Sequence, residues 1–159
     1  MTFLQKVAEE KRILVKEKKE STPLERLQRR AKTRTKRPFY EVFKERRPKD
    51  ALIIAEIKKA SPSRGVLKKD LNVPVLAQQY QEGGASAISV ITETKHFMGS
   101  LGFLPLVKRA AGLPVLRKDF IVDPYELYES KVYGADAVLL IGELLGKDER
   151  RVSCHRQGH

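Results

Sequence analysis

Two lysines and one carboxylate stand where they can do acid–base chemistry. Glu56 and Lys58 lie at the end of the apolar run 52–57, and Lys118 ends the run 114–118. Because side chains alternate between the two faces of a strand, Glu56 and Lys58 point the same way. An ammonium group in a site of low dielectric can bind anions or donate a proton, and a neighbouring carboxylate holds it in the charged form. Spacing alone leaves catalysis and a structural ion pair equally open.

The runs that carry these residues belong to a repeating pattern that begins near residue 51. Four short, mostly aliphatic runs without a clean polar face predict strands buried on both sides. Cap, proline and glycine signals predict a helix after each of the first three runs. The predicted strands are 52–57, 87–92, 114–118 and 137–141, and the predicted helices are about 72–84, 102–111 and 123–134. This alternation is typical of a parallel sheet with helical crossovers.

Two parallel architectures fit this pattern, an open doubly wound sheet and a closed (β/α)8 barrel. A dinucleotide-binding sheet would need a G-x-G-x-x-G loop after its first strand, but residues 58–65 read Lys-Lys-Ala-Ser-Pro-Ser-Arg-Gly. Polar residues follow strand after strand at its carboxyl end, where barrel enzymes place their chemistry, and Glu93 and Asp119 extend the set. The sequence therefore favours an α/β fold of the (β/α)8 TIM-barrel type.

Residues 1–50 predict a helical extension ahead of the barrel. Thr2 and Gln5 form a capping box for the first helix, and Thr22 followed by Pro23 predicts the cap of a second helix with proline in its first position. The predicted elements are helices over about 2–19 and from 23 onward, a linker over 33–38 and an amphipathic segment over 39–45.

The positive charge of the chain is concentrated in this extension. Residues 1–50 contain 17 Lys or Arg and 8 Asp or Glu, and so carry +9 of the net charge of +12. Clustered cations can bind RNA by releasing counterions from phosphates, but this chain has no interleaved aromatics for base stacking and no nucleic-acid module. No nucleic-acid partner is predicted. The pattern favours a solvated basic face made of Arg29, Arg30, Lys32, Arg34, Lys36 and Arg37.

Composition also indicates where in the cell the chain is located and which kinds of site it can form. No apolar run approaches the roughly 20 residues that span a bilayer, and the N-terminus lacks a signal peptide, so a cytoplasmic protein without a membrane partner is expected. The single Cys154 cannot pair within the chain, and no second cysteine stands at zinc-ligand spacing. No disulfide and no metal site are predicted, even though His155 and His159 are close to Cys154 in the sequence.

Four blocks of sequence carry a more specific pattern. The first combines Ile-Ala-Glu-Ile-Lys with Ser-Pro-Ser, the second contains Ser-Val-Ile-Thr-Glu and Lys-His-Phe-x-Gly-Ser, the third reads Leu-Arg-Lys-Asp-Phe-Ile-Val-Asp and the fourth Gly-Ala-Asp-Ala-Val-Leu-Leu-Ile. In this order and spacing they resemble the indole-3-glycerol-phosphate synthase family, and the resemblance covers roughly residues 1–146. A different phosphate-handling barrel enzyme of the same pathway matches the blocks less well. The blocks are residues 54–63, 89–100, 116–123 and 134–141.

The resemblance implies a decarboxylating lyase of tryptophan biosynthesis that needs no cofactor. Its small phosphorylated substrate is 1-(2-carboxyphenylamino)-1-deoxyribulose 5-phosphate, which closes to a ring, loses CO2 and is dehydrated to the indole. By resemblance, Lys118 is the general acid, Lys58 engages substrate anions, and Glu56 orients the lysines and takes part in proton movement. Ser61 lines the pocket near the phosphate end, and the residues expected around the anthranilate ring are Phe97, Phe120 and Leu139.

The family barrel continues through four more units, which carry a catalytic glutamate and the phosphate cradle. Residues 51–146 match only the first four units, and residues 147–159 form an atypical tail without a helical period. The expectation is an incomplete barrel with little or no synthase activity alone, and truncation, a frameshift, a fragment and a damaged gene all stay open as its origin. Open sheet edges and an exposed apolar inner layer also predict oligomers or aggregation.

Overall fold

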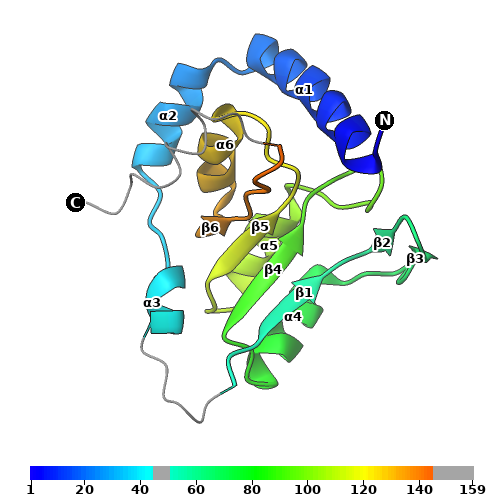
Figure 1. Cartoon of the computed structure of the whole chain (residues 1–159). Helices are drawn as coiled ribbons and strands as arrows, with labels where there is room; N and C mark the ends of the chain where they lie inside the picture. Colours follow the sequence, from blue (N-terminus) through cyan, green and yellow to red (C-terminus); the bar gives the residue numbers. More distant parts are fainter. Residues whose placement is uncertain (45–50, 145–159) are drawn as a thin grey trace.

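Four parallel strands form the sheet that the apolar runs predict. The computed structural model describes residues 1–44 and 51–144. The strand order is β1-β4-β5-β6, and every neighbouring pair is parallel (Figure 1). Each strand therefore lies beside the one before it, as in the first part of a barrel, and the sheet does not close among the described residues. The strands are β1 (Ile54–Ile57), β4 (Ala87–Ile91), β5 (Val115–Lys118) and β6 (Ala137–Val138).

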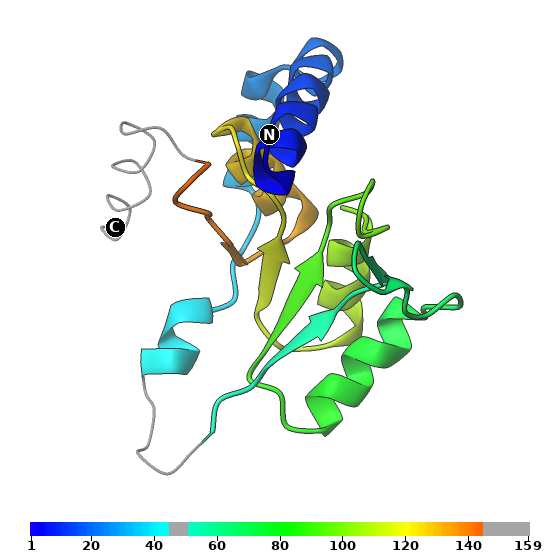
Figure 2. The ribbon, with the colours of Figure 1, turned by 45° about the vertical axis from the view of Figure 1, so that its right-hand side comes forward.

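Helices cover one face of this sheet, and the main core lies between the two layers. Ile57, Val90 and Val115 point from three strands toward Leu104 and Val107, and all five side chains are buried. Burial of each aliphatic side chain of this size contributes about 1.5–3 kcal/mol. Figure 2 shows the helices that follow β1 and β4 on the same side of the strands. The crossover helices are α4 (Val73–Glu82), α5 (Phe103–Ala110) and α6 (Tyr125–Tyr133).

The opposite face of the sheet, here called the inner face, is open. Its apolar side chains include Ile54, which is 43% exposed, and Leu139, which is 36% exposed. Parallel pairing places Glu56 opposite Ser89, so these two residues share the inner face. The inner face therefore carries both the polar residues of interest and uncovered apolar surface.

The prediction of the strands needs correction at two places. The fourth strand was predicted over 137–141, but β6 ends at Val138, because its hydrogen bonds to β5 stop with the N–H of Leu139, which donates to the carbonyl of Arg117. The loop after β1 also forms a short antiparallel hairpin of β2 (Ala60–Ser61) and β3 (Gly65–Val66) that the sequence did not predict. Strands of two residues leave no periodic signal, so the hairpin could not be recognised.

The N-terminal region forms three helices, and its first cap is confirmed. Thr2 Oγ1 accepts a hydrogen bond from the backbone N–H of Gln5, and Gln5 Oε1 accepts one from the N–H of Thr2. The second cap was predicted wrongly, because Pro23 occupies the cap position and Thr22 instead closes the first helix through its N–H to the carbonyl of Lys18. The helices are α1 (Phe3–Ser21), α2 (Leu24–Lys32) and α3 (Phe39–Lys44).

A second core attaches α1 and α2 to the helix α6. Val15 and Leu27 pack there with Tyr125 and Val132, and all four are buried. Figure 1 shows α2 beside α6, while α1 runs across the end of the molecule toward the loops that follow the strands. No helix in the two described ranges is long and apolar enough to cross a membrane. The helical extension is thus part of the packed structure.

The linker before α3 contains one arginine that is not part of a solvated face. Arg37 donates hydrogen bonds from its guanidinium to the carbonyl oxygens of Lys108, Ala111 and Leu113, and from its N–H to Asp136 Oδ1 at 2.7 Å. Its assignment to the solvated basic face was therefore wrong. The last carbonyl groups of a helix have no hydrogen-bond partner within the helix. A guanidinium has five N–H donors and can bond several of these carbonyl groups at once.

Candidate functional site

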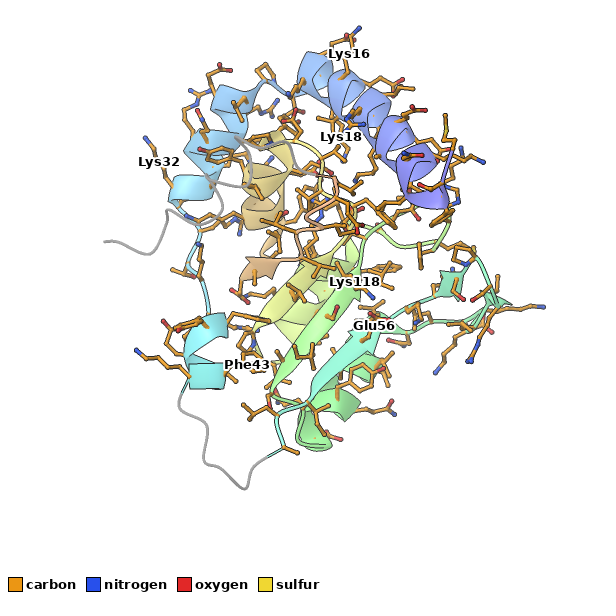
Figure 3. The ribbon with its side chains drawn as sticks, viewed as in Figure 1. Lys16, Lys18, Lys32, Phe43, Glu56 and Lys118 are labelled. Carbon is orange, nitrogen blue, oxygen red and sulfur yellow. The ribbon has the colours of Figure 1, made fainter. Side chains whose placement is uncertain are left out.

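Glu56 joins two lysines from different strands at the carboxyl edge of the sheet. Lys58 Nζ donates to Glu56 Oε1 at 2.9 Å, and Lys118 Nζ donates to Glu56 Oε2 at 2.7 Å. The strand β4 lies between β1 and β5, so the Glu56 and Lys118 side chains reach across it on the inner face, as Figure 3 shows. The structure thus brings together the three residues that the sequence proposed for acid–base chemistry, here called the inner triad.

The electrostatics of the inner triad favour charged groups. Burial raises the pKa of the Glu56 carboxyl, but hydrogen bonds and charges from Lys118 and Lys58 outweigh burial, and the pKa lies below its ordinary value of 4.5. One carboxylate is shared by two ammonium groups, so the triad carries a net charge of +1. The Lys118 side chain is 42% exposed and that of Lys58 is 35% exposed. The cluster can therefore receive an anionic ligand from the inner side.

The aromatic residues expected near the substrate ring lie together beside the strand ends. The ring centroids of Phe97 and Phe120 are 6.2 Å apart, and Phe3 of α1 lies 6.4 Å from Phe120. Phe3 also makes an edge contact with His96. Phe3 was not among the site residues expected from the sequence, because its approach to Phe120 depends on how α1 docks. Clustered aromatic faces at a strand end suit a flat apolar ligand.

A buried carboxylate shapes the loop that carries Phe97. Glu93 accepts hydrogen bonds from the backbone N–H groups of Lys95, His96 and Phe97 and is only 5% exposed. A Cβ at Gly99 would lie 2.8 Å from the carbonyl oxygen of Glu93, so the loop returns too close to its own start for any other residue. Glu93 was grouped with the polar residues that could do chemistry, but its carboxylate is fully used in holding the loop.

The remaining two expected site residues lie on either side of the inner triad. Leu139 follows β6, and its N–H donates to the carbonyl of Arg117, which places it level with Lys118 on the inner face. Ser61 lies in β2, where its Oγ accepts from the N–H of Arg64. The hairpin is attached to the aromatic loop through the N–H of Ala60, which donates to the carbonyl of Phe97 at 3.1 Å.

Behind Lys118, on the side of the sheet that faces the helices, lies a buried ionic network that the sequence did not reveal. Arg117 is fully buried and contacts Asp119 at 2.8 Å, Glu129 at 3.0 Å and Glu126 at 3.5 Å. Lys11 of α1 contacts Glu126 at 2.7 Å and Asp119 at 3.2 Å. This outer network consists of three cations and three carboxylates: Lys11, Lys18, Arg117, Asp119, Glu126 and Glu129.

Charge balance keeps the outer network ionised. Burial alone would raise the pKa of Asp119, but the charges of Arg117 and Lys11 and hydrogen bonds from Arg117 and Thr92 lower it to about 2. Burial alone would lower the pKa of Arg117, but the charges of Asp119, Glu129 and Glu126 raise it above its ordinary value. Asp119 was grouped with the polar residues at the strand ends, yet its side chain belongs to this network and not to the inner face.

A cavity at the ends of the strands does not coincide with the inner triad. This cavity of about 570 Å³ lies between α1 and the ends of β4 and β5, and its lining includes Val7, Lys11, Leu14, Glu93 and Asp119. None of the seven expected site residues lines it. The inner triad lies outside this cavity, on the inner face, where the Lys118 side chain is 42% exposed. Within residues 1–44 and 51–144 no group of three His, Cys, Asp or Glu side chains could hold a metal ion.

Ser89, on the inner face, has a buried hydroxyl without a hydrogen-bond partner among the described residues. Its Oγ neither donates nor accepts a hydrogen bond. The hydroxyl of Thr92, by contrast, donates to Asp119 and accepts from Arg117. An unpaired buried polar group costs about 1–3 kcal/mol, so Ser89→Ala should leave the free energy of unfolding unchanged or raise it. Urea unfolding of Ser89→Ala and of Thr92→Val checks this. A loss in Ser89→Ala as large as in Thr92→Val would contradict it.

A parallel sheet in which each strand lies beside the preceding one, with crossover helices on one face and polar side chains at its carboxyl edge, has the arrangement of consecutive units of a (β/α)8 barrel. The family model for indole-3-glycerol phosphate synthase matches residues 4–155. The chain therefore belongs to the indole-3-glycerol phosphate synthase family. The prediction from the four sequence blocks is confirmed. The tail over 147–159 and Cys154 lie outside the described residues.

Curated relatives agree with the family match. Indole-3-glycerol phosphate synthases from Carboxydothermus hydrogenoformans and Chlorobium chlorochromatii are 43% and 44% identical over 152 residues, which is 92% and 95% of this chain. That from Rhodopirellula baltica is 53% identical over 97 residues, 61% of this chain. The chain spans 58%, 59% and 38% of the length of these three relatives. It thus spans a little over half of the length of the first two of these relatives and less of the third.

Proposed function

We propose that this chain carries the general acid and part of the substrate pocket of an indole-3-glycerol phosphate synthase active site. In the proposed reaction 1-(2-carboxyphenylamino)-1-deoxyribulose 5-phosphate loses one CO2 and one water and becomes indole-3-glycerol phosphate. A carbon–carbon bond forms between the aromatic ring and the former carbonyl carbon, the carboxylate leaves as CO2, and the carbonyl oxygen leaves as water. The observation that carries the proposal is the inner triad, in which two ammonium groups from different strands share Glu56.

In this proposal Lys118 is the general acid. Its ammonium group lies at the carboxyl end of β5, where it can protonate the oxygen that departs as water. Glu56 is hydrogen bonded to Lys118 at 2.7 Å, so it can hold the ammonium group in its charged form and aim it at the departing oxygen. Lys58 supplies the second positive charge and neutralises an anionic group of the substrate. No cofactor takes part.

The proposed orientation of the substrate follows from the neighbours of the triad. Phe97 and Phe120 supply aromatic faces for the anthranilate ring, and Leu139 adds an apolar contact level with Lys118. Ser61, in the hairpin after β1, is assigned to the phosphate end of the pocket. The chain spans about 58% of its relatives, so the proposal assigns the rest of the phosphate site and the catalytic base to the part of the family fold that these residues do not cover.

Two further properties are proposed with the activity. The pathway and the lack of a membrane-spanning helix in the described residues support a cytoplasmic location. Self-association is assigned to the inner face and to the edge strands β1 and β6, because the backbone groups on the outer side of each edge strand and the exposed Ile54 and Leu139 can pair with another chain.

A chimera tests the proposed activity. Residues 1–144 of this chain are joined to the remaining part of the Carboxydothermus hydrogenoformans relative, whose own full-length enzyme is the control. Release of CO2 and formation of the indole chromophore are measured with the ribulose phosphate. Turnover by the chimera supports the proposal. A chimera that folds, as judged by cooperative unfolding, but gives no product while the control is active would contradict it.

A further inference from the structure

The two neighbours of Lys118 in the sequence are both held in the outer network. Arg117 and Asp119 have side chains that are 0% and 1% exposed, and both point to the helix-covered side of β5. Lys118 points the other way, toward Glu56 on the inner face. The backbone position from which Lys118 extends is therefore determined by contacts on the opposite side of the sheet.

Lys11 connects this arrangement to α1. Its side chain is 7% exposed, and its ammonium group bridges Asp119, directly after β5, and Glu126 of α6. The outer network has three cations and three carboxylates. Removal of the Lys11 charge would leave Asp119 and Glu126 sharing Arg117, with one buried negative charge in excess. Two buried carboxylates that share one cation repel each other, and a shift at Asp119 moves the adjacent Lys118.

We propose that Lys11 is a positioning residue: through Asp119 it holds the end of β5 so that Lys118 meets Glu56. The catalytic meaning of this role rests on the proposed function, since Lys118 matters for turnover only if it is the general acid. The positioning itself is a property of the ion pair between Lys118 and Glu56. It can be measured in the 159-residue chain without any turnover.

Amine labelling reports on the ion pair directly. A lysine in an ion pair reacts more slowly with an acylating reagent than a free one, because only the neutral amine is the nucleophile. Limited acetylation followed by peptide mass spectrometry gives the labelling of Lys118 relative to the exposed Lys32 in the same molecule. In Lys11→Met this ratio should rise about two- to fivefold, the range expected when a partly exposed ion pair is lost. Lys16→Met removes an equal charge from the exposed side of α1 and should leave the ratio unchanged.

A second variant, which compensates the lost charge of Lys11, separates a role in positioning Lys118 from a role in only anchoring α1. Lys11→Met combined with Glu126→Gln restores charge balance, and the glutamine can still accept from the N–H of Val122, as Glu126 Oε2 does. This double variant should return the Lys118 ratio toward the wild-type value. A single variant that unfolds at lower urea but keeps the wild-type ratio would show that Lys11 only anchors α1, and would overturn the proposal.

Two provisions keep the test decisive. If Lys11→Met does not fold, Lys11→Gln takes its place, because it removes the charge but keeps a donor, and the same rise in the ratio is expected. A chimera without synthase turnover would end the proposed function and leave the labelling result standing. An unchanged ratio in both Lys11 variants would overturn the positioning role whether or not the chimera is active.

Discussion

Lys118→Met should abolish most of the synthase activity of the chimera. General acid catalysis contributes about 10²–10⁴-fold to a rate, so kcat/KM should fall by about that factor, while methionine keeps the length and packing of the side chain. Lys118 Nζ lies 2.7 Å from Glu56 Oε2, and a methionine at this position has no proton to donate. Steady-state rates of indole formation measure the effect.

The matched control for this prediction is Lys16→Met, because Lys16 is exposed on α1 and far from the inner triad in sequence and structure (Figure 3). Its kcat/KM should equal that of the unmodified chimera. Lys58→Met should differ from both, with a larger rise in KM than fall in kcat, since Lys58 is assigned to binding an anionic group. Equal activity of Lys118→Met and Lys16→Met would exclude Lys118 as the general acid.

Arg117→Leu should destabilise the chain by about 3–5 kcal/mol, the cost of breaking a buried ion pair by removing one partner. The guanidinium contacts Asp119, Glu129 and Glu126 and also donates to Thr92 and Ser130. Leucine fills much of the space but leaves three carboxylates against two lysines in a dry region. The free energy of unfolding in urea is the quantity to measure.

Arg12→Leu is the control for the arginine substitution, because Arg12 is exposed in the middle of α1. Exposed substitutions of this kind change the free energy of unfolding by about 0.5 kcal/mol or less. A similar small change in Arg117→Leu would mean that Arg117 and its carboxylates are not buried together, and the account of the outer network would fail.

The alternation of apolar runs and helix signals was sufficient to predict the parallel sheet and the helices between its strands. Glu56 and Lys118 could be proposed as neighbours because both lie near the carboxyl end of a strand, and the carboxyl ends of parallel strands meet at one edge of the sheet. The order β1-β4-β5 leaves one strand between them, a distance that long charged side chains span. The roles of these residues came from the sequence blocks, since spacing alone left a structural ion pair equally open.

The outer network could not be predicted because its partners come from segments far apart in the sequence. Lys11 and Asp119 are brought together only when α1 docks against the end of β5. One signal was present in the sequence: Arg117 precedes Lys118, so the period of two places these two charges on opposite faces of a buried strand. A charge directed to the helix-covered face of a buried strand needs a partner there. That argument identifies Arg117 but not the residues that pair with it.

A carbon-13 NMR titration of the Glu56 carboxyl in the 159-residue chain tests most directly whether Glu56 is hydrogen bonded to both lysines. The account predicts a pKa below the ordinary value of 4.5, because the hydrogen bonds from Lys118 and Lys58 outweigh burial. It also predicts that the pKa rises in Lys118→Met, since one of the two ammonium partners is lost. A pKa at or above 4.5 that does not respond to Lys118→Met would contradict the inner triad and with it the proposed site.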